Sequence, residues 1–163
     1  MNVPPGASDE VAGLCSELIR FDTSNYGPDG SKGEREATEY IATLLEEVGI
    51  TCTVLESEPR RTSLVAEWAP EGCDTSLPPL LIHGHTDVVP AVASDWQVDP
   101  FAGEVIDGYV WGRGAVDMKD FDAIVPSRAS VCSASSAVIR TPSASSIASR
   151  NCCWAGRIRG GQE

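Results

Sequence analysis

The sequence predicts an α/β fold, arranged as a three-layer αβα sandwich around a mostly parallel sheet. Three observations indicate it: two amphipathic helical segments, two short segments rich in β-branched residues, and one continuous apolar run at residues 80–85. A strand without polar alternation is typical of a central strand that is covered on both faces. Helices mixed with strands of this kind favour layers of helices packed on a parallel sheet.

Two helices are predicted from the spacing of apolar residues and from their end signals. Residues 9–20 follow a capping serine, carry acids in the first turn and repeat apolar residues along one face. A second helix starts at SKGE (31–34), which has the form of a capping box: Ser31 caps while Glu34 reaches back. Apolar residues then recur at helical spacing until Gly49, which provides the stop signal.

Further strands are predicted on both sides of the apolar run. Residues 51–55 and 62–68 are β-branched or alternating, which favours extended structure. Asp107 and Gly108 separate GEVI from YVWG, and an Asp-Gly pair between two such segments predicts a short hairpin.

Composition excludes several classes of function. The net charge is −12, from 24 acidic and 12 basic residues, which argues against nucleic acid and anionic membranes as partners. No apolar run approaches the roughly 18–20 residues of a membrane span. The N-terminus lacks a basic segment followed by an apolar stretch, so we expect a cytoplasmic protein. Six cysteines occur without a C-x-x-C pair, which favours reduced thiols.

The apolar run ends in a group of candidate site residues. The stretch LLIHGHTDVVP (80–90) holds both histidines of the chain, and alternation places His85 and Asp87 on the same side. A carboxylate two residues from a metal-binding imidazole can hold its second ring N–H. Further along, Asp117 follows a glycine-rich bend in GRGAVDMKD. Taken separately, His85 also fits an ordinary surface or core histidine, and Asp117 also fits a solvated loop acid or a helix cap.

Four segments in fixed order together resemble a known family. They are LIRFDTSN (18–25), LLIHGHTDVVP (80–90), WQVDPFAG (96–103) and DGYVWGRGAVDMKD (107–120). They are similar to the start of the co-catalytic zinc metallopeptidases that include aminoacylases, glutamate carboxypeptidase, acetylornithine deacetylase and succinyl-diaminopimelate desuccinylase. The resemblance covers about residues 8–122 and implies a zinc-exopeptidase-like sandwich.

The resemblance implies a role for each matching residue. His85 would ligate one zinc, Asp117 would bridge two zincs, and Asp87 would be the catalytic-site aspartate that orients His85. His83 matches no required position. Two zinc ions are the implied cofactors, with cobalt or manganese also suited to such ligands. The implied activity is hydrolysis of an amide or peptide bond in an N-acyl amino acid or a dipeptide.

The chain departs from that family after Asp122. No histidine follows His85, and no acidic residue occurs from residue 123 to residue 162. The family's glutamate pair, its further ligands and its dimerising lid domain therefore have no counterpart here. We expect an incomplete domain with little or no activity of its own. The alternative is a non-catalytic fragment that binds metal weakly or not at all; a single-metal lyase or phosphatase has no substrate-recognition feature in its favour.

The composition changes at the same point. Residues 123–163 contain 9 Ser, 7 Ala and 5 Arg, whereas residues 1–122 hold 23 of the 24 acids. We therefore divide the chain into the start of a catalytic domain at 1–122 and an atypical tail at 123–163. The tail fits a frameshifted reading of a GC-rich gene, and a flexible linker is the other interpretation.

Overall fold

The computed structural model describes residues 7–27, 30–69, 74, 76–78 and 80–132. The elements along the chain are α1 (Ala7–Arg20), α2 (Arg35–Glu47), β1 (Thr51–Glu58), β2 (Arg61–Glu67), a 3₁₀ turn (Ala93–Asp95), β3 (Glu104–Ile106), β4 (Tyr109–Trp111) and α3 (Lys119–Cys132). Both predicted helices and the predicted strands at 51–55 and 62–68 are confirmed, with small differences at their ends.

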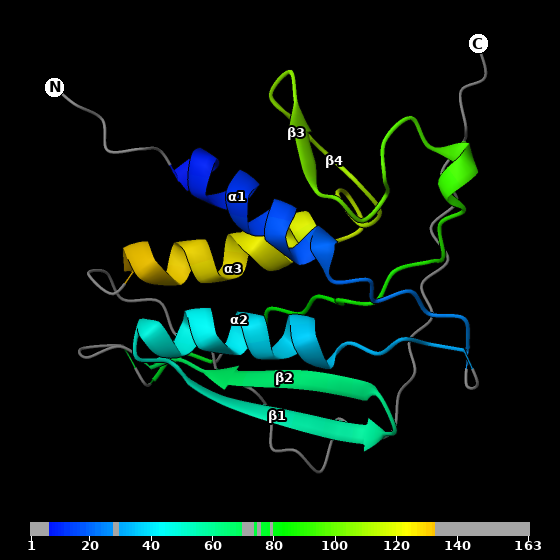
Figure 1. Cartoon of the computed structure of the whole chain (residues 1–163). Coiled ribbons are helices and arrows are strands. Elements are labelled where there is room, and N and C mark those ends of the chain that lie inside the picture. Colours follow the sequence, from blue (N-terminus) through cyan, green and yellow to red (C-terminus); the bar gives the residue numbers. More distant parts are fainter. Residues whose placement is uncertain (1–6, 28–29, 70–73, 75, 79, 133–163) are drawn as a thin grey trace, which may run out of the picture.

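The three helices lie side by side, and the β1–β2 ribbon covers the outer side of α2 (Figure 1). α3 packs between α1 and α2, while the β3–β4 hairpin stands beside α1. The core joins the facing sides of these elements. Its buried members are Cys15, Leu18, Ile19, Ala37, Ile41, Leu45, Ile50 and Ala123. Burial of this apolar stripe, rather than helix propensity, supplies most of the stability of short helices such as these.

The fold is α/β, but the described strands pair antiparallel in two separate two-stranded sheets, β1 with β2 and β3 with β4. The mostly parallel sheet is not present in this part of the chain. Residues 81–87 form no strand, and Leu80 and Leu81 are 60% and 55% exposed. The prediction of a central strand at residues 80–85 is therefore wrong for the described structure, because this segment forms no hydrogen-bonded ladder with a named strand. A parallel contact does occur as an isolated bridge between Ser24 and Val88.

The start of α2 differs from the predicted capping box. The Ser31 hydroxyl bonds to Asn25 and Gly27, and the N-cap residue is Glu34, whose side chain makes no capping bond. The Glu34 carboxylate instead bonds to Arg61 and to the main-chain N–H of Thr62. A tertiary ion pair has thus replaced the local bond that the sequence pattern predicts. The stop signal is confirmed, since Gly49 adopts a φ of 81° just after α2.

α3 crosses the composition boundary. The helix continues to Cys132 although residues 123–132 show little helical periodicity and include Pro126. Buried Ala123 and Ser127 show why: small side chains let α3 pack closely on α1. Residues 133–163, and with them most of the atypical tail, lie outside the described residues.

Two of the expected thiols are seen directly. Cys15, which is buried, and Cys52 are free cysteines. Burial raises the pKa of the Cys15 thiol to about 11, with the nearby Asp120 carboxylate adding to the effect. Such a thiol is protonated and unreactive at neutral pH. Among the helices of the described residues, none has the length and apolar character needed to cross a membrane.

Candidate metal centre

The segment that carries His85 and Asp87 is held by the chain that leaves α1. Val88 donates to the carbonyl of Thr23 at 3.2 Å, and its own carbonyl accepts from Asn25 at 2.8 Å. The Thr23 hydroxyl donates to the carbonyl of Thr86 at 2.6 Å. These bonds fix the backbone on both sides of Asp87, so the H-x-D motif has a defined position without belonging to a sheet.

Asp117 reaches the same place from the loop that precedes α3. Lys119 anchors this loop: its side chain is fully buried, and its ammonium donates to the carbonyls of Leu18 at 2.9 Å and Phe21 at 2.7 Å. Burial lowers the pKa of Lys119 to about 8. The anchor ties the first turn of α3 to the end of α1, which presents Asp117 toward His85 with 78% of its side chain exposed.

His85 lies between the two aspartates. Its Nε2 atom is 3.1 Å from Asp117 Oδ1. Its Nδ1 atom is 2.9 Å from the main-chain oxygen of Asp87 and 3.3 Å from the carboxylate oxygen Oδ1. Partial burial disfavours the charged imidazolium, but the carbonyl and carboxylate of Asp87, together with Asp117, outweigh it and raise the pKa of His85. The arrangement therefore attracts a positive charge to the imidazole.

The second oxygen of Asp87 is held by two donors. Oδ2 accepts from Asn25 Nδ2 at 2.8 Å and from an Arg61 guanidinium nitrogen at 3.3 Å. Burial opposes ionisation of this carboxyl group, but the donors Asn25 and Arg61 outweigh it and lower its pKa. Asp87 is thus an anion at neutral pH with one oxygen facing His85, which is the arrangement expected of a carboxylate that orients a metal-binding imidazole.

A third carboxylate lies beneath this group. Asp122, on the first turn of α3, is 8% exposed, and a Cβ atom at Gly84 would lie 2.5 Å from its Oδ1 atom. Its Oδ2 atom has no hydrogen-bond partner among the residues that the structure describes. Burial raises the pKa of Asp122 to about 7, although the charges of His85 and Lys119 act against the rise.

The donors present fit zinc in kind and in spacing. Two ligand atoms of a tetrahedral zinc, each about 2.0–2.1 Å from the metal, lie about 3.3 Å apart. The 3.1 Å between His85 Nε2 and Asp117 Oδ1 is close to that separation. The set is nevertheless incomplete: within the described ranges, no group of three or more His, Cys, Asp or Glu side chains is placed to hold a metal ion.

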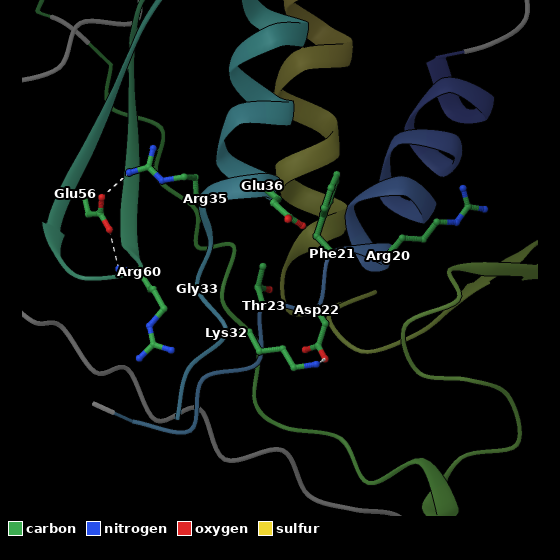
Figure 2. Close-up of a pocket in the computed structure, with 10 residues that line it drawn as sticks. All are labelled: Arg20, Phe21, Asp22, Thr23, Lys32, Gly33, Arg35, Glu36, Glu56 and Arg60. Carbon is green, nitrogen blue, oxygen red and sulfur yellow. Dashed lines mark hydrogen bonds and ion pairs between the residues drawn. The ribbon is translucent and has the colours of Figure 1, made fainter. Parts of the chain in front are cut away.

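A cavity of about 550 Å³ lies elsewhere, between the end of α1, the start of α2 and the β1–β2 turn (Figure 2). None of the predicted site residues lines it. Its charged lining consists of the cations Arg20, Lys32, Arg35 and Arg60 and the acids Asp22, Glu36 and Glu56. Lys32 pairs with Asp22, and Arg35 pairs with Glu56, as the dashed lines in Figure 2 show. Because its charges are largely satisfied by each other, we assign no ligand to this cavity.

The structure thus brings together all three residues that the sequence singled out, and leaves His83 exposed beside them. It adds residues that sequence reasoning missed: Asn25, Glu34, Arg61, Lys119 and Asp122. Asn25 and Lys119 occur within the four motif segments, which was a usable signal. Arg61 had none, because two adjacent arginines in a turn are typical of a solvated loop.

Comparison with known proteins decides the family. Residues 81–126 match the family model described as peptidase family M20/M25/M40, and the match contains both His85 and Asp117. The N-terminal part of the chain belongs to this family. Residues 81–126 of this M20 protein run from the apolar segment into α3, so the match coincides with the part of the structure that forms the candidate metal centre.

Three curated relatives of this M20 chain carry the same name. Succinyl-diaminopimelate desuccinylase of Rhodospirillum centenum is 41% identical over 118 residues, which are 69% of this chain and 28% of the relative. The enzyme of Cereibacter sphaeroides is 38% identical over 112 residues, 68% and 27% of the two chains. That of Wolbachia pipientis wMel is 42% identical over 107 residues, 65% and 24%. The chain spans about a quarter of the length of these relatives.

Proposed function

We propose that this chain supplies the first metal ligands of a metal-dependent amide hydrolase. The observation that carries the proposal is the 3.1 Å approach of His85 Nε2 to Asp117 Oδ1 within the segment that matches the M20 family. His85 would hold one ion, and Asp117, which presents an exposed carboxylate, would bridge two. Asp87 would keep the imidazole oriented through its contact with Nδ1.

Zinc is the metal that these donors favour, with cobalt and manganese as alternatives. When bound, the metal supplies polarisation of the amide carbonyl and activation of water. The residues of this chain do the positioning. The main-chain oxygen and the carboxylate of Asp87 both face His85 Nδ1 and would hold a proton there, which would leave Nε2 as the metal ligand. Lys119 fixes the loop that presents Asp117.

The names of the relatives support a substrate class for the proposal. Three curated relatives carry the name succinyl-diaminopimelate desuccinylase, which denotes removal of a succinyl group from an amino acid. We infer a small N-acyl amino acid as the substrate of the whole protein, with a dipeptide as the other member of the class. The cleaved bond is an amide in either case.

The whole catalytic domain would be a three-layer sandwich with a mostly parallel sheet. The exposed apolar residues Leu80, Leu81 and Ile82 support this, since large apolar side chains that follow one another along an extended segment fit a strand covered on both faces. Residues 1–122 would belong to that domain, while residues 123–163 would differ from it in origin, by a frameshift or as a linker. Sequencing the gene beyond codon 115 in all three frames tests this: a frame that continues the helix and encodes a glutamate pair would support the frameshift.

A second candidate is a non-catalytic fragment with weak metal binding. It is favoured by the incomplete ligand set: His85 and Asp117 are two ligands, whereas structural and catalytic zinc sites have three or four protein ligands. In the sequence as it stands, no histidine follows His85. We therefore expect the chain alone to release little product from N-acyl amino acids or dipeptides, even with zinc added. Turnover that disappears in Asp87→Ala would refute this second candidate.

Replacing His85 with alanine is expected to weaken zinc binding at least about tenfold, because it removes one of two protein ligands. Asp117→Ala should have a similar effect. His83→Ala is the matched control, since His83 is exposed, lies two residues away and has no assigned role. Competition of the purified chain with a chromophoric zinc chelator measures the dissociation constant for each variant. Equal affinities of His85→Ala and His83→Ala would overturn the ligand assignment.

A further inference from the structure

We propose that Arg61 and Glu34 are positioning residues of the candidate metal centre: Glu34 fixes the guanidinium of Arg61, and Arg61 holds Asp87 in the orientation that faces His85. The link to metal binding rests on the proposed function. The orientation of Asp87 itself does not, and it can be measured without a metal.

The inner end of this connection is a buried carboxylate. Glu34, the N-cap of α2, is 3% exposed. Its Oε1 atom lies 2.5 Å from one terminal nitrogen of Arg61, and its Oε2 atom accepts the main-chain N–H of Thr62 at 3.3 Å. Both oxygens are occupied by donors at the start of β2. The carboxylate therefore holds one edge of the guanidinium in a fixed position relative to α2.

The outer end of the connection reaches the site. The second terminal nitrogen of Arg61 lies 3.3 Å from Asp87 Oδ2, which also accepts from Asn25 at 2.8 Å. Rotation of the Asp87 carboxylate would break both bonds, so Oδ1 stays 3.3 Å from His85 Nδ1. Charges alternate along the path from Glu34 through Arg61 to Asp87, and each group is held by one of opposite sign.

The geometry requires an arginine. A planar guanidinium presents donors along two edges and can bridge two separate carboxylates, whereas an ammonium is a compact point charge. Without a cation between them, the carboxylates of buried Glu34 and half-buried Asp87 would repel one another, which costs free energy. Arg61→Lys keeps the charge and loses the two-edged contact, and Arg61→Gln loses both.

A purely structural role would be a salt bridge that ties α2 to the β1–β2 ribbon and nothing more. Arg35 makes such a bridge to β1: its guanidinium nitrogens contact Glu56 in β1 at 2.5 Å and Glu39 in α2 at 3.0 Å, and neither partner is a residue of the metal centre. Arg35→Gln is therefore the matched control for Arg61→Gln. It removes an arginine that bridges two carboxylates and leaves the surroundings of Asp87 intact.

The test is the tautomer of His85 in the metal-free full chain, read from the ¹⁵N shifts of its ring nitrogens at a pH where the imidazole is neutral. The chain has two histidines, so His83 serves as an internal reference. Arg61→Gln is expected to reduce the share of His85 that carries its proton on Nδ1. Arg61→Lys and Glu34→Gln should give smaller changes in the same direction, and Arg35→Gln should give none.

Unchanged His85 shifts in folded Arg61→Gln would overturn the inference, as would an equal change in Arg35→Gln. Should Arg61→Gln fail to fold by circular dichroism, Glu34→Gln and Arg61→Lys decide in its place. Zinc affinity provides the second readout, with a loss of about tenfold expected in Arg61→Gln. A tautomer change without zinc binding in any variant would support this inference and contradict the proposed function. Zinc binding that depends on His85 but not on Arg61, with no tautomer change, would contradict this inference and support the proposed function.

Discussion

Replacing Gly103 with alanine is expected to lower the free energy of unfolding by about 3 kcal/mol, from backbone strain and a forced shift of packed chain. Gly103 has a φ of 61°, a conformation that a Cβ atom disfavours. The added Cβ would lie 2.2 Å from the main-chain oxygen of Ser16, inside α1. The two backbones would have to separate. Because Gly103 directly precedes β3, the hairpin that leads to Asp117 would lose its contact with α1.

Gly108→Ala is the matched control for this change. Gly108 also has a positive φ, 82°, but nothing lies within 4 Å of a Cβ atom built on it. Only the backbone strain remains, so a loss of about 1 kcal/mol is expected. Urea unfolding followed by circular dichroism measures both variants. Equal losses would show that the contact with Ser16 relaxes at no cost and would contradict the close packing of Gly103 on α1.

Replacing Asp122 with asparagine is expected to raise the free energy of unfolding above pH 7 by at most about 4 kcal/mol. The Asp122 carboxylate is buried, its Oδ2 atom lacks a hydrogen-bond partner among the described residues, and burial raises its pKa to about 7 from 3.8. Lys119 attracts the charged form, but its ammonium donates to two backbone carbonyls instead. Asparagine has a similar shape and carries no charge to desolvate.

The pH dependence has a definite sign. Since the folded state holds the Asp122 proton more tightly than the unfolded state, stability from this group is fully present below about pH 4 and is lost as the pH rises to about 7. The difference between Asp122→Asn and the unchanged chain should therefore be near zero at the low end and grow through this window. Urea unfolding at several pH values measures it. A difference that is constant with pH would mean that Asp122 is ionised in the folded state throughout.

Much of the local structure was predictable from sequence. The helices that became α1 and α2 were predicted because apolar residues repeat along one face and Gly49 ends the second of them. The β3–β4 hairpin followed from Asp107 and Gly108, which both adopt the positive φ of its turn. The capping box was wrong because the Glu34 carboxylate bonds to Arg61 and to the main-chain N–H of Thr62 instead of reaching back to the main chain of Ser31. α3 was not predicted, because small residues and Pro126 obscure its periodicity.

The candidate site was predictable in part. The pairing of His85 with Asp87 follows from two-residue spacing along an extended segment. The approach of Asp117 could be expected only from the family resemblance, because 32 residues separate it from His85. The pattern of apolar residues alone could not establish the expected parallel sheet, because a strand forms only where a neighbouring strand completes its ladder. In the described part of the chain, residues 81–87 form no such ladder.

By itself, the sequence determined the two amphipathic helices, the hairpin turn, the acidic charge and the H-x-D motif with the three other segments that accompany it. Only the tertiary structure decided that Arg61, 26 residues before Asp87, reaches its carboxylate while Glu34 holds the other edge. It also decided that Lys119 binds the end of α1 and that Asp122 lies buried beside Gly84. The physical reason is that the cost of burying a charge depends on the partners that packing places around it. Those partners come from distant parts of the chain, so they are set by the whole fold.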